Sequence, residues 1–203
     1  MRAHNVGVLI VAIVAGWPAY SAAQEVVRPG EWSRGTTLSG FAGVATDGDR
    51  SGPVIGGVAG YEITPRFTIE ASGSWLEFGD GVDAFAGAIK LRARLSGQRT
   101  VDPFVSGGVG FYRASFDRTS SVGPGFYRNR LRAPGTSLGD TSFTDPALVV
   151  GAGVNVFVTR HFALRPDVES FIVLRDGPSL AVTSLSLHAV FHIESHPVTP
   201  RVR

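Results

Sequence analysis

Eight stretches of this chain alternate apolar and polar residues with a period of two, and helical periodicity is almost absent. In the third stretch, Phe67, Ile69 and Trp75 share one face, whereas Thr68 and Glu70 share the other. Successive side chains of a β-strand point to opposite faces, so this pattern is typical of strands that separate two environments. The sequence therefore predicts an all-β fold, with strands at residues 37–45, 54–63, 67–78, 84–95, 103–116, 147–158, 162–174 and 182–193.

The length of these strands and of their connections favours a membrane barrel. Strands of soluble proteins usually run about 5–6 residues, whereas a tilted strand needs about 9–11 residues to cross a bilayer. Transmembrane barrels combine short periplasmic turns with longer external loops, and an even number of strands places both termini in the periplasm. The predicted short or moderate connections are 64–66, 96–102 and 159–161, and those on the other side are 46–53, 79–83, 117–146 and 175–181.

Charged residues of both signs gather on the same faces of these strands. They are Glu62, Glu70, Lys90, Arg92, Arg94, Arg165, Asp167 and Glu169. If these faces point inward, the charges can pair inside a barrel while the apolar faces meet lipid. If they point outward, the chain is a soluble β-sandwich with a solvated surface. We favour the barrel, and we interpret the carboxylates Asp167 and Glu169 as structural groups neutralised by arginines of the fourth strand.

Aromatic residues near the predicted strand ends could form the two girdles that flank the apolar band of a membrane barrel. The candidates are Phe67, Trp75, Phe78, Phe85, Phe104, Tyr112, Phe116, Phe157, Phe162 and Phe191. Ordinary core aromatics are the alternative.

The N-terminus has the three parts of a secretory signal peptide. Arg2 and His4 form a basic start, an apolar run covers residues 6–15, and Ser21-Ala22-Ala23 provides a small-x-small cleavage site. The apolar run is too short for a transmembrane helix, which needs about 20 residues. An uncleaved amphipathic anchor is the alternative. We expect a signal peptide at 1–23, a periplasmic segment at 24–36, the barrel at 37–193 and a tail at 194–203.

Composition excludes several classes of function. The chain has no cysteine, which excludes disulfides, thiolate nucleophiles and cysteine metal sites. Its formal net charge of +2 falls by one when Arg2 leaves with the signal peptide, and a near-neutral chain gives no reason to expect nucleic-acid binding.

No catalytic, cofactor or metal site is predicted. His188 and His192 share a strand face, but four residues of strand separate them by about 13 Å, and His196 follows in the tail. Ser184 or Ser186 near His188 could form a Ser–His pair, although no G-x-S-x-G elbow is present. Polar lining of a barrel is the interpretation we favour, so we expect no enzyme activity.

Three motifs resemble strands of the OmpA-like outer-membrane barrel superfamily. Residues 103–112 resemble its P-[FY]-x-x-G-G-x-G strand, residues 149–154 its G-x-G strand, and residues 66–71 its aromatic-x-[LIV]-E strand opening. The resemblance spans nearly all of the mature chain and implies a closed, eight-stranded, antiparallel up-and-down barrel with a polar, salt-bridged interior. The family's last strand usually ends the chain with an aromatic residue. Here residues 194–203 follow Ile193, so the assembly signal is internal or imperfect.

Three classes of function remain open. The one we favour is a structural or surface-interaction barrel of a Gram-negative outer membrane, with a narrow pore or conduit and a lipid-A-modifying enzyme as alternatives. The long external segment carries arginines suited to the phosphates of lipopolysaccharide, although a simply solvated loop fits equally well. These arginines are Arg118, Arg128, Arg130 and Arg132. Expected partners are outer-membrane lipids, lipopolysaccharide, the barrel-assembly machinery and periplasmic chaperones, and we expect a monomer.

Overall fold

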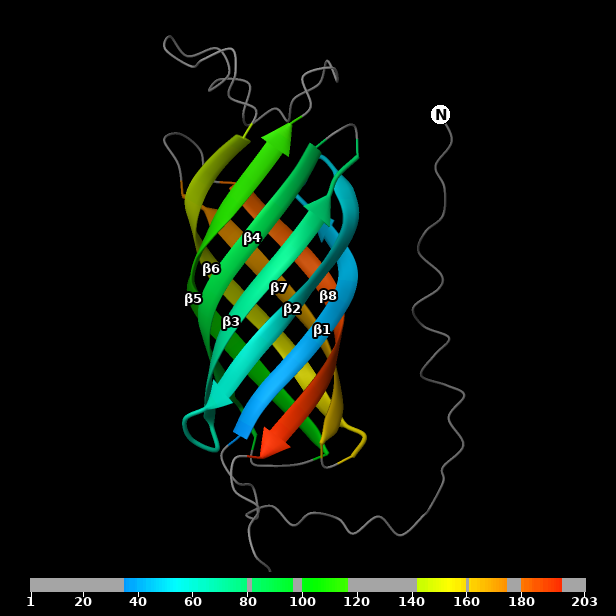
Figure 1. The fold of residues 1–203 in the computed structure, drawn as a ribbon, viewed down its shortest axis with the longest axis vertical. Helices are drawn as coiled ribbons and strands as arrows, with labels where there is room; N and C mark the ends of the chain where they lie inside the picture. The colour runs from blue at the N-terminus through cyan, green and yellow to red at the C-terminus, as the bar shows by residue number, and fades with distance from the viewer. Residues whose placement is uncertain are drawn as a thin grey trace, which may run out of the picture.

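Eight long antiparallel strands make up the fold in the computed structural model (Figure 1), which describes residues 35–79, 82–96, 100–116, 142–159, 161–174 and 180–194. The predicted strands are all present, with ends that differ from the prediction by at most five residues. They are β1 (Gly35–Thr46), β2 (Ser51–Glu62), β3 (Phe67–Glu77), β4 (Val82–Arg94), β5 (Val101–Phe116), β6 (Ser142–Phe157), β7 (Phe162–Val173) and β8 (Leu180–Glu194).

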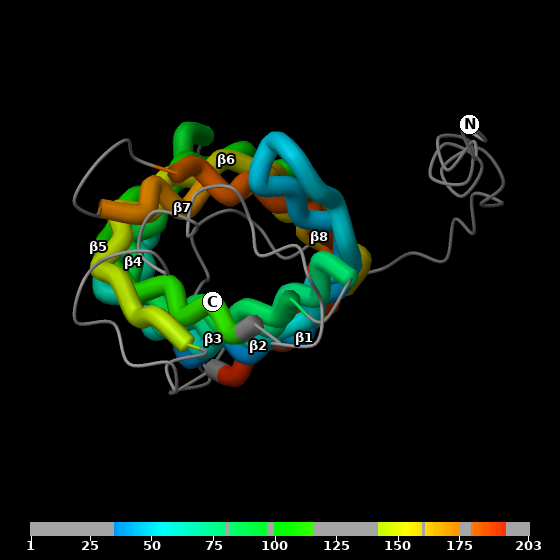
Figure 2. The backbone as a smooth tube through the Cα atoms, turned by 90° about the horizontal axis from the view of Figure 1, so that it is seen from above, coloured from blue at the N-terminus to red at the C-terminus, as the bar shows by residue number. Residues whose placement is uncertain are grey.

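Each strand pairs with its neighbours in the chain, and the last strand pairs with the first. The register between β1 and β8 runs from Gly35 opposite Glu194 to Thr46 opposite Thr183, and it closes the sheet into a barrel. Seen from above, the strands form a complete ring (Figure 2). The prediction of a closed, eight-stranded, all-antiparallel barrel is therefore confirmed. Within the described ranges, no helix is long and apolar enough to span a membrane.

The barrel has two different ends. Gly35 and Glu194 lie together at one end, which we call the proximal end, and the opposite end is the distal end (Figure 1). Tight turns join β2 to β3 and β6 to β7 at the proximal end, where the amide of Ile63 donates to the carbonyl of Phe67 at 3.0 Å. The longest segment between neighbouring strands, residues 117–141, connects β5 to β6 at the distal end.

The starts of three strands were predicted too late, each beside a proline (Pro53, Pro103 or Pro146), and β5 and β6 show the reason. β5 begins at Val101 and β6 at Ser142, so Pro103 and Pro146 lie inside strands. The pairing of β5 with β4 starts only at Phe104, and that of β6 with β7 only at Ala147. At each proline the strand is paired with only one neighbour. The missing N–H faces the unpaired side, so no hydrogen bond of the sheet is lost. Its carbonyl still accepts a 2.8 Å hydrogen bond, from the amide of Leu95 or Leu174.

The outer face of the barrel is a continuous apolar surface. Large apolar side chains at alternate positions of every strand are more than a third exposed, as lipid-facing residues of a membrane barrel would be. Of the aromatic residues expected in girdles, Phe67, Trp75, Phe85 and Phe191 are exposed. Phe162 and Phe157 are half-buried, and the side chain of Phe116 lies outside the described residues.

For three other aromatic residues the girdle prediction was wrong. Phe78, Phe104 and Tyr112 are buried, because each stands an even number of residues from the inward-facing positions of its own segment. Phe104, for example, is two residues from buried Asp102 in β5. The prediction relied on proximity to a strand end. The alternation of inward and outward positions would have assigned these rings to the interior.

Some glycines of the barrel wall stand where a side chain would collide with the next strand. A Cβ on Gly108 would lie 2.1 Å from the carbonyl oxygen of Ile89 and 2.7 Å from Cα of Lys90. A Cβ on the adjacent Gly107, which faces outward, would approach the carbonyl oxygen of Val149 only to 3.9 Å, an ordinary contact. The close approach of β5 to β4 at Gly108 therefore requires the absence of a side chain.

We predict that Gly108→Ala destabilises the barrel by about 1–3 kcal/mol, the usual effect of overpacking a well-packed site. Gly107→Ala, the matched control, should unfold at nearly the urea concentration of the wild type, because its methyl group points outward and makes only an ordinary contact with the carbonyl oxygen of Val149. Urea unfolding of the refolded protein in detergent, followed by the gel mobility of the folded barrel, measures both. Equal midpoints for the two variants would contradict this account of Gly108.

Candidate functional site in the barrel interior

The interior is divided into a charged proximal half and a mostly apolar distal half, in which Asp145 of β6 is a buried carboxylate. Along β4, the inward side chains change from Val82 and Ala84 at the distal end to Arg92 and Arg94 at the proximal end. The sequence analysis expected a polar interior throughout and missed the distal half, which we call the apolar plug. It consists of Ala45, Val54, Leu76, Phe78, Val82, Ala84, Ala86, Ala88, Tyr112, Ala114, Ala147, Val149, Phe171, Val173 and Val182.

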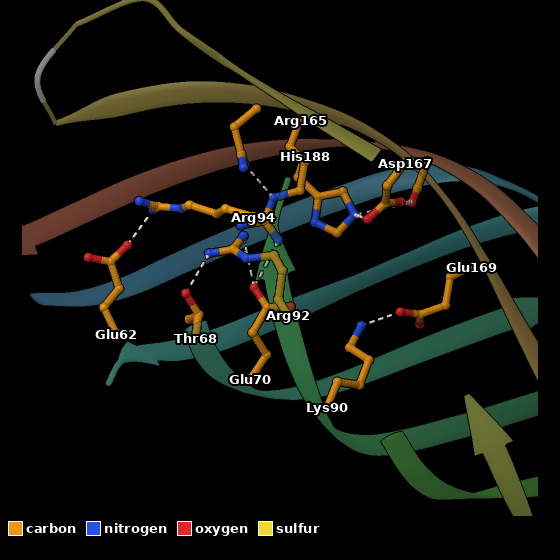
Figure 3. Close-up of polar contacts among 12 residues, drawn as sticks. Glu62, Thr68, Glu70, Lys90, Arg92, Arg94, Arg165, Asp167, Glu169 and His188 are labelled. Atoms are coloured by element: carbon orange, nitrogen blue, oxygen red, sulfur yellow. Dashed lines mark hydrogen bonds and ion pairs between the residues drawn. The ribbon is translucent and has the colours of Figure 1, made fainter. Parts of the chain in front are cut away.

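A single carboxylate joins two arginines at the centre of the charged half (Figure 3). Oε1 of Glu70 lies 3.1 Å from Nη1 of Arg92 and 3.1 Å from Nη1 of Arg165. The guanidinium carbons of both arginines also lie 5.4 Å from the ring centroid of Phe104, close enough for cation–π attraction. Glu70, on β3, thus holds together side chains from β4 and β7.

A second cluster surrounds Arg94 nearer the proximal end. Its Nη2 lies 2.5 Å from Oε1 of Glu62, its Nε lies 3.1 Å from Oδ2 of Asp102, and its Nη1 donates to the carbonyl of Pro65 at 3.3 Å. Asp102 also accepts a 3.1 Å hydrogen bond from the hydroxyl of Ser96. This arginine therefore ties β2, β4 and β5 together. We call the six groups Glu62, Glu70, Arg92, Arg94, Asp102 and Arg165 the ion-pair network.

Three further polar contacts lie between the ion-pair network and the apolar plug. Lys90 on β4 forms a salt bridge with Glu169 on β7 (Figure 3). Asp167 accepts a 2.6 Å hydrogen bond from the hydroxyl of Ser186, and its other oxygen lies 3.0 Å from Nε2 of His188. These contacts complete the transition from charged to apolar lining along the barrel axis.

The histidine cluster does not have the geometry of a catalytic relay. Nε2 of His188 faces both the Ser186 hydroxyl, at 3.2 Å, and the Asp167 carboxylate. In a Ser-His-Asp triad the acid binds one ring nitrogen and the serine binds the other. The ring of Phe41 stacks on the imidazole with centroids 4.5 Å apart, and Ser186, His188 and Asp167 are all buried. The cluster is therefore arranged as buried polar lining.

The structure places every charged residue proposed for the interior on an inward-facing position. Seven of the eight are buried, and the side chain of Glu169 is 15% exposed. Sequence reasoning missed three interior groups, Asp102, Asp145 and Asn155. Asp102 had been assigned to a turn, yet it stands two residues before the inward-facing Phe104, a spacing that would have indicated its direction. The loop residues Arg118, Arg128, Arg130 and Arg132 lie outside the described residues, as does His196.

Two small cavities lie between the side chains of the lumen. One cavity, between the apolar plug and the Lys90–Glu169 pair, has a volume of about 10 Å³, and another of about 10 Å³ lies at the proximal end beside Asn155. A volume of this size accommodates about one water molecule. No group of three or more metal-ligating His, Cys, Asp or Glu side chains is found in the part of the chain that the structure describes.

Comparison with known proteins agrees with this architecture. Residues 8–192 match the sequence model of the outer membrane protein β-barrel domain. The chain belongs to this family. A comparison with curated protein sequences found no match.

Two solved structures share the fold. One is Neisserial surface protein A, with 15% sequence identity and a TM-score of 0.58 over 77% of this chain and 96% of that one. The other is the N-terminal β-barrel domain of Pseudomonas aeruginosa OprF, with 14% identity and a TM-score of 0.56 over 79% of this chain and 100% of that one. Membership of the family identifies the chain as an outer-membrane β-barrel, and at these identities the two likenesses concern the fold alone.

We predict that Glu70→Ala destabilises the barrel by about 3–5 kcal/mol, because it leaves Arg92 and Arg165 as buried charges without their shared carboxylate. Glu77→Ala is the matched control, since Glu77 lies on the same strand with an exposed side chain. Its urea midpoint should stay close to that of the wild type, because exposed charges contribute little. A Glu70→Ala midpoint as high as that of the control would show that the central carboxylate does not hold the network together.

Proposed function

We propose that this chain is a sealed outer-membrane barrel that acts at the membrane surface through its external connections, and that it is not a pore. The observation that carries the proposal is the filling of the lumen from both ends. The apolar plug occupies the distal half and the ion-pair network occupies the proximal half, with cavities of only about 10 Å³ between the side chains. An eight-stranded barrel has an interior that side chains can just fill, and this chain fills it.

Pairing inside the lumen supports the same conclusion. An ion or polar solute that crossed the barrel would have to separate Glu70 from its two arginines and then pass a stretch lined by Tyr112, Phe171 and Leu76. Breaking a buried ion pair is strongly unfavourable, and an apolar constriction offers a polar solute no replacement for its water. The alternative of a narrow pore is therefore the weaker proposal.

The enzyme alternative has little support from the interior. Ser186 and His188 are buried below the plug, and His188 shares one ring nitrogen between Ser186 and Asp167. A lipid-modifying enzyme needs its nucleophile and base where a lipid can reach them. We infer a non-enzymatic role, together with export behind the signal peptide at 1–23, insertion by the barrel-assembly machinery with the help of periplasmic chaperones, and a monomeric state.

We expect the purified barrel to give no stable open channel in planar lipid bilayers, because the plug and the network close the lumen in series. A large open porin reconstituted in the same way serves as the positive control for detection. Long-lived stepwise conductance from this protein, at a protein density at which boiled samples are silent, would contradict the sealed barrel and support the pore.

The external segment 117–141 is the part of the chain that we propose contacts lipopolysaccharide. Guanidinium groups bind phosphate through paired, charge-assisted hydrogen bonds. Replacing Arg118, Arg128, Arg130 and Arg132 together by glutamine should weaken binding to lipopolysaccharide-containing vesicles at least tenfold, equivalent to about 1.4 kcal/mol. Arg113→Gln, which changes one exposed arginine of β5, is the control. If the variant with all four substitutions binds lipopolysaccharide-containing vesicles as the wild type does, the proposed role of this segment is contradicted.

A further inference from the structure

The outer face of the barrel carries an apolar groove across β1 and β2. Gly40 of β1 lies opposite Gly57 of β2, and both residues are exposed on the outward face. A Cβ on Gly57 would approach only the carbonyl oxygen of Ser39, at 3.5 Å, and a Cβ on Gly40 would have its nearest neighbour at 4.0 Å. Leu38 and Phe191, an exposed pair across β1 and β8, form one wall. The groove has a volume of about 380 Å³.

The row of glycines continues onto β3 and β4, where aromatic rings of this chain cover it. Gly57 pairs with Gly73, and Gly73 pairs with Gly87. A Cβ on Gly87 would lie 2.7 Å from the ring of Phe111, and one on Gly73 would lie 3.6 Å from the ring of Phe85. A ring over a glycine restores the packing that the missing side chain would have supplied. Among the described residues, no ring takes this place on β1 and β2, so the groove there is open.

The surroundings of the groove indicate what fills it. The chain belongs to the outer membrane protein β-barrel family, so its apolar outer face meets the hydrocarbon of a membrane. Apolar atoms beside an empty space lose their dispersion contacts, and the bilayer core holds no water that could fill it. A flexible acyl chain can follow a groove of this kind, and it is continuous with the lipid that covers the rest of the outer face.

The position of the groove along the strands indicates the leaflet from which the acyl chain comes. Tyr61 is exposed on the same face of β2 as Gly57 and lies nearer the proximal end. Four residues of strand separate the two by about 13 Å. The hydrocarbon core of a bilayer is about 30 Å thick, so one leaflet supplies about 15 Å. Because tyrosine is enriched at membrane–water interfaces, a lipid with its headgroup beside Tyr61 has an acyl chain long enough to reach Gly57.

We propose that this groove binds one acyl chain of a phospholipid from the periplasmic leaflet, with the headgroup beside Tyr61 and the chain over Gly57 and Gly40. On β1 and β2 the acyl chain takes the place that Phe111 has on β4. The choice of leaflet rests on the proposed function, in which the proximal end faces the periplasm. The groove itself depends only on the register of β1 and β2.

Filling the groove with a side chain tests the site. Gly57→Leu directs its side chain into the groove, and its Cβ makes only an ordinary contact, so the variant should fold. Gly107→Leu is the matched control, because Gly107 is an outward glycine of β5 whose Cβ would lie 3.9 Å from its nearest neighbour. Each refolded protein is placed in phosphatidylethanolamine and phosphatidylglycerol vesicles with a trace of phospholipid that carries a photoreactive diazirine in one acyl chain.

After illumination, trypsin releases β1 and β2 in the separate peptides 35–50 and 51–66, which end at Arg50 and Arg66. In the wild type and in Gly107→Leu, these peptides should carry roughly three times as much label as the other strands, since dispersion contacts are small but add along the chain. Gly57→Leu should lose this enrichment. Equal labelling of all strands in the wild type, or enrichment that survives in Gly57→Leu, would overturn the proposal. If Gly57→Leu does not fold, Gly40→Leu fills the same groove.

A diazirine in the headgroup identifies the source of the acyl chain. It should label β2 around Tyr61 more than the proximal ends of the other strands, without a preference near Ile55. Preference near Ile55 would show that the chain enters from the external leaflet and would overturn the assignment to a periplasmic phospholipid. A dimer in detergent that Gly57→Leu abolishes would show that a second copy fills the groove and would overturn the lipid. Conductance of the lumen is independent of these outcomes, because the groove lies on the other side of the barrel wall.

Discussion

Closing eight strands into a barrel forces every second side chain into one narrow lumen, and charges placed there must find partners inside it. Glu70 meets this requirement for two arginines at once, since one of its oxygens contacts both Arg92 and Arg165 at 3.1 Å. These partners come from β3, β4 and β7, so the pairing links β7 directly to β3 and β4, which the hydrogen-bond ladder joins to it only through other strands. The arrangement of side chains in the charged proximal half of the lumen depends on this contact.

The two halves of the interior stabilise the barrel by different means. The apolar plug needs only shape and volume, and Tyr112, Phe171 and several alanines supply both. The ion-pair network also needs correctly oriented hydrogen bonds, because each guanidinium donor must point at an oxygen. Lys90 and Glu169 lie where the two kinds of packing meet. The proposal of a sealed lumen rests on this succession of ion-paired and apolar packing along the barrel axis.

Most of the fold follows from the alternation of residues, whereas the pairing inside the barrel does not. The period of two identified all eight strands and the direction of Glu62, Glu70 and Arg92. The same alternation would have assigned Phe78 and Tyr112 to the plug, but it does not indicate which inward side chains meet across the lumen. Contact between Lys90 and Glu169, which are 79 residues apart, depends on the geometry of the closed barrel, which no local pattern encodes.

Residue types associated with catalysis can also serve the barrel itself, and their geometry separates the two roles. Ser186, His188 and Asp167 have the composition of a hydrolase triad, yet serine and aspartate converge on one imidazole nitrogen. That nitrogen carries at most one proton, so it cannot both accept a proton from the serine and donate one to the aspartate, as a relay requires. With the plug on one side and the ion-pair network on the other, the Asp167 carboxylate gives both the Ser186 hydroxyl and the His188 ring a polar partner inside the barrel.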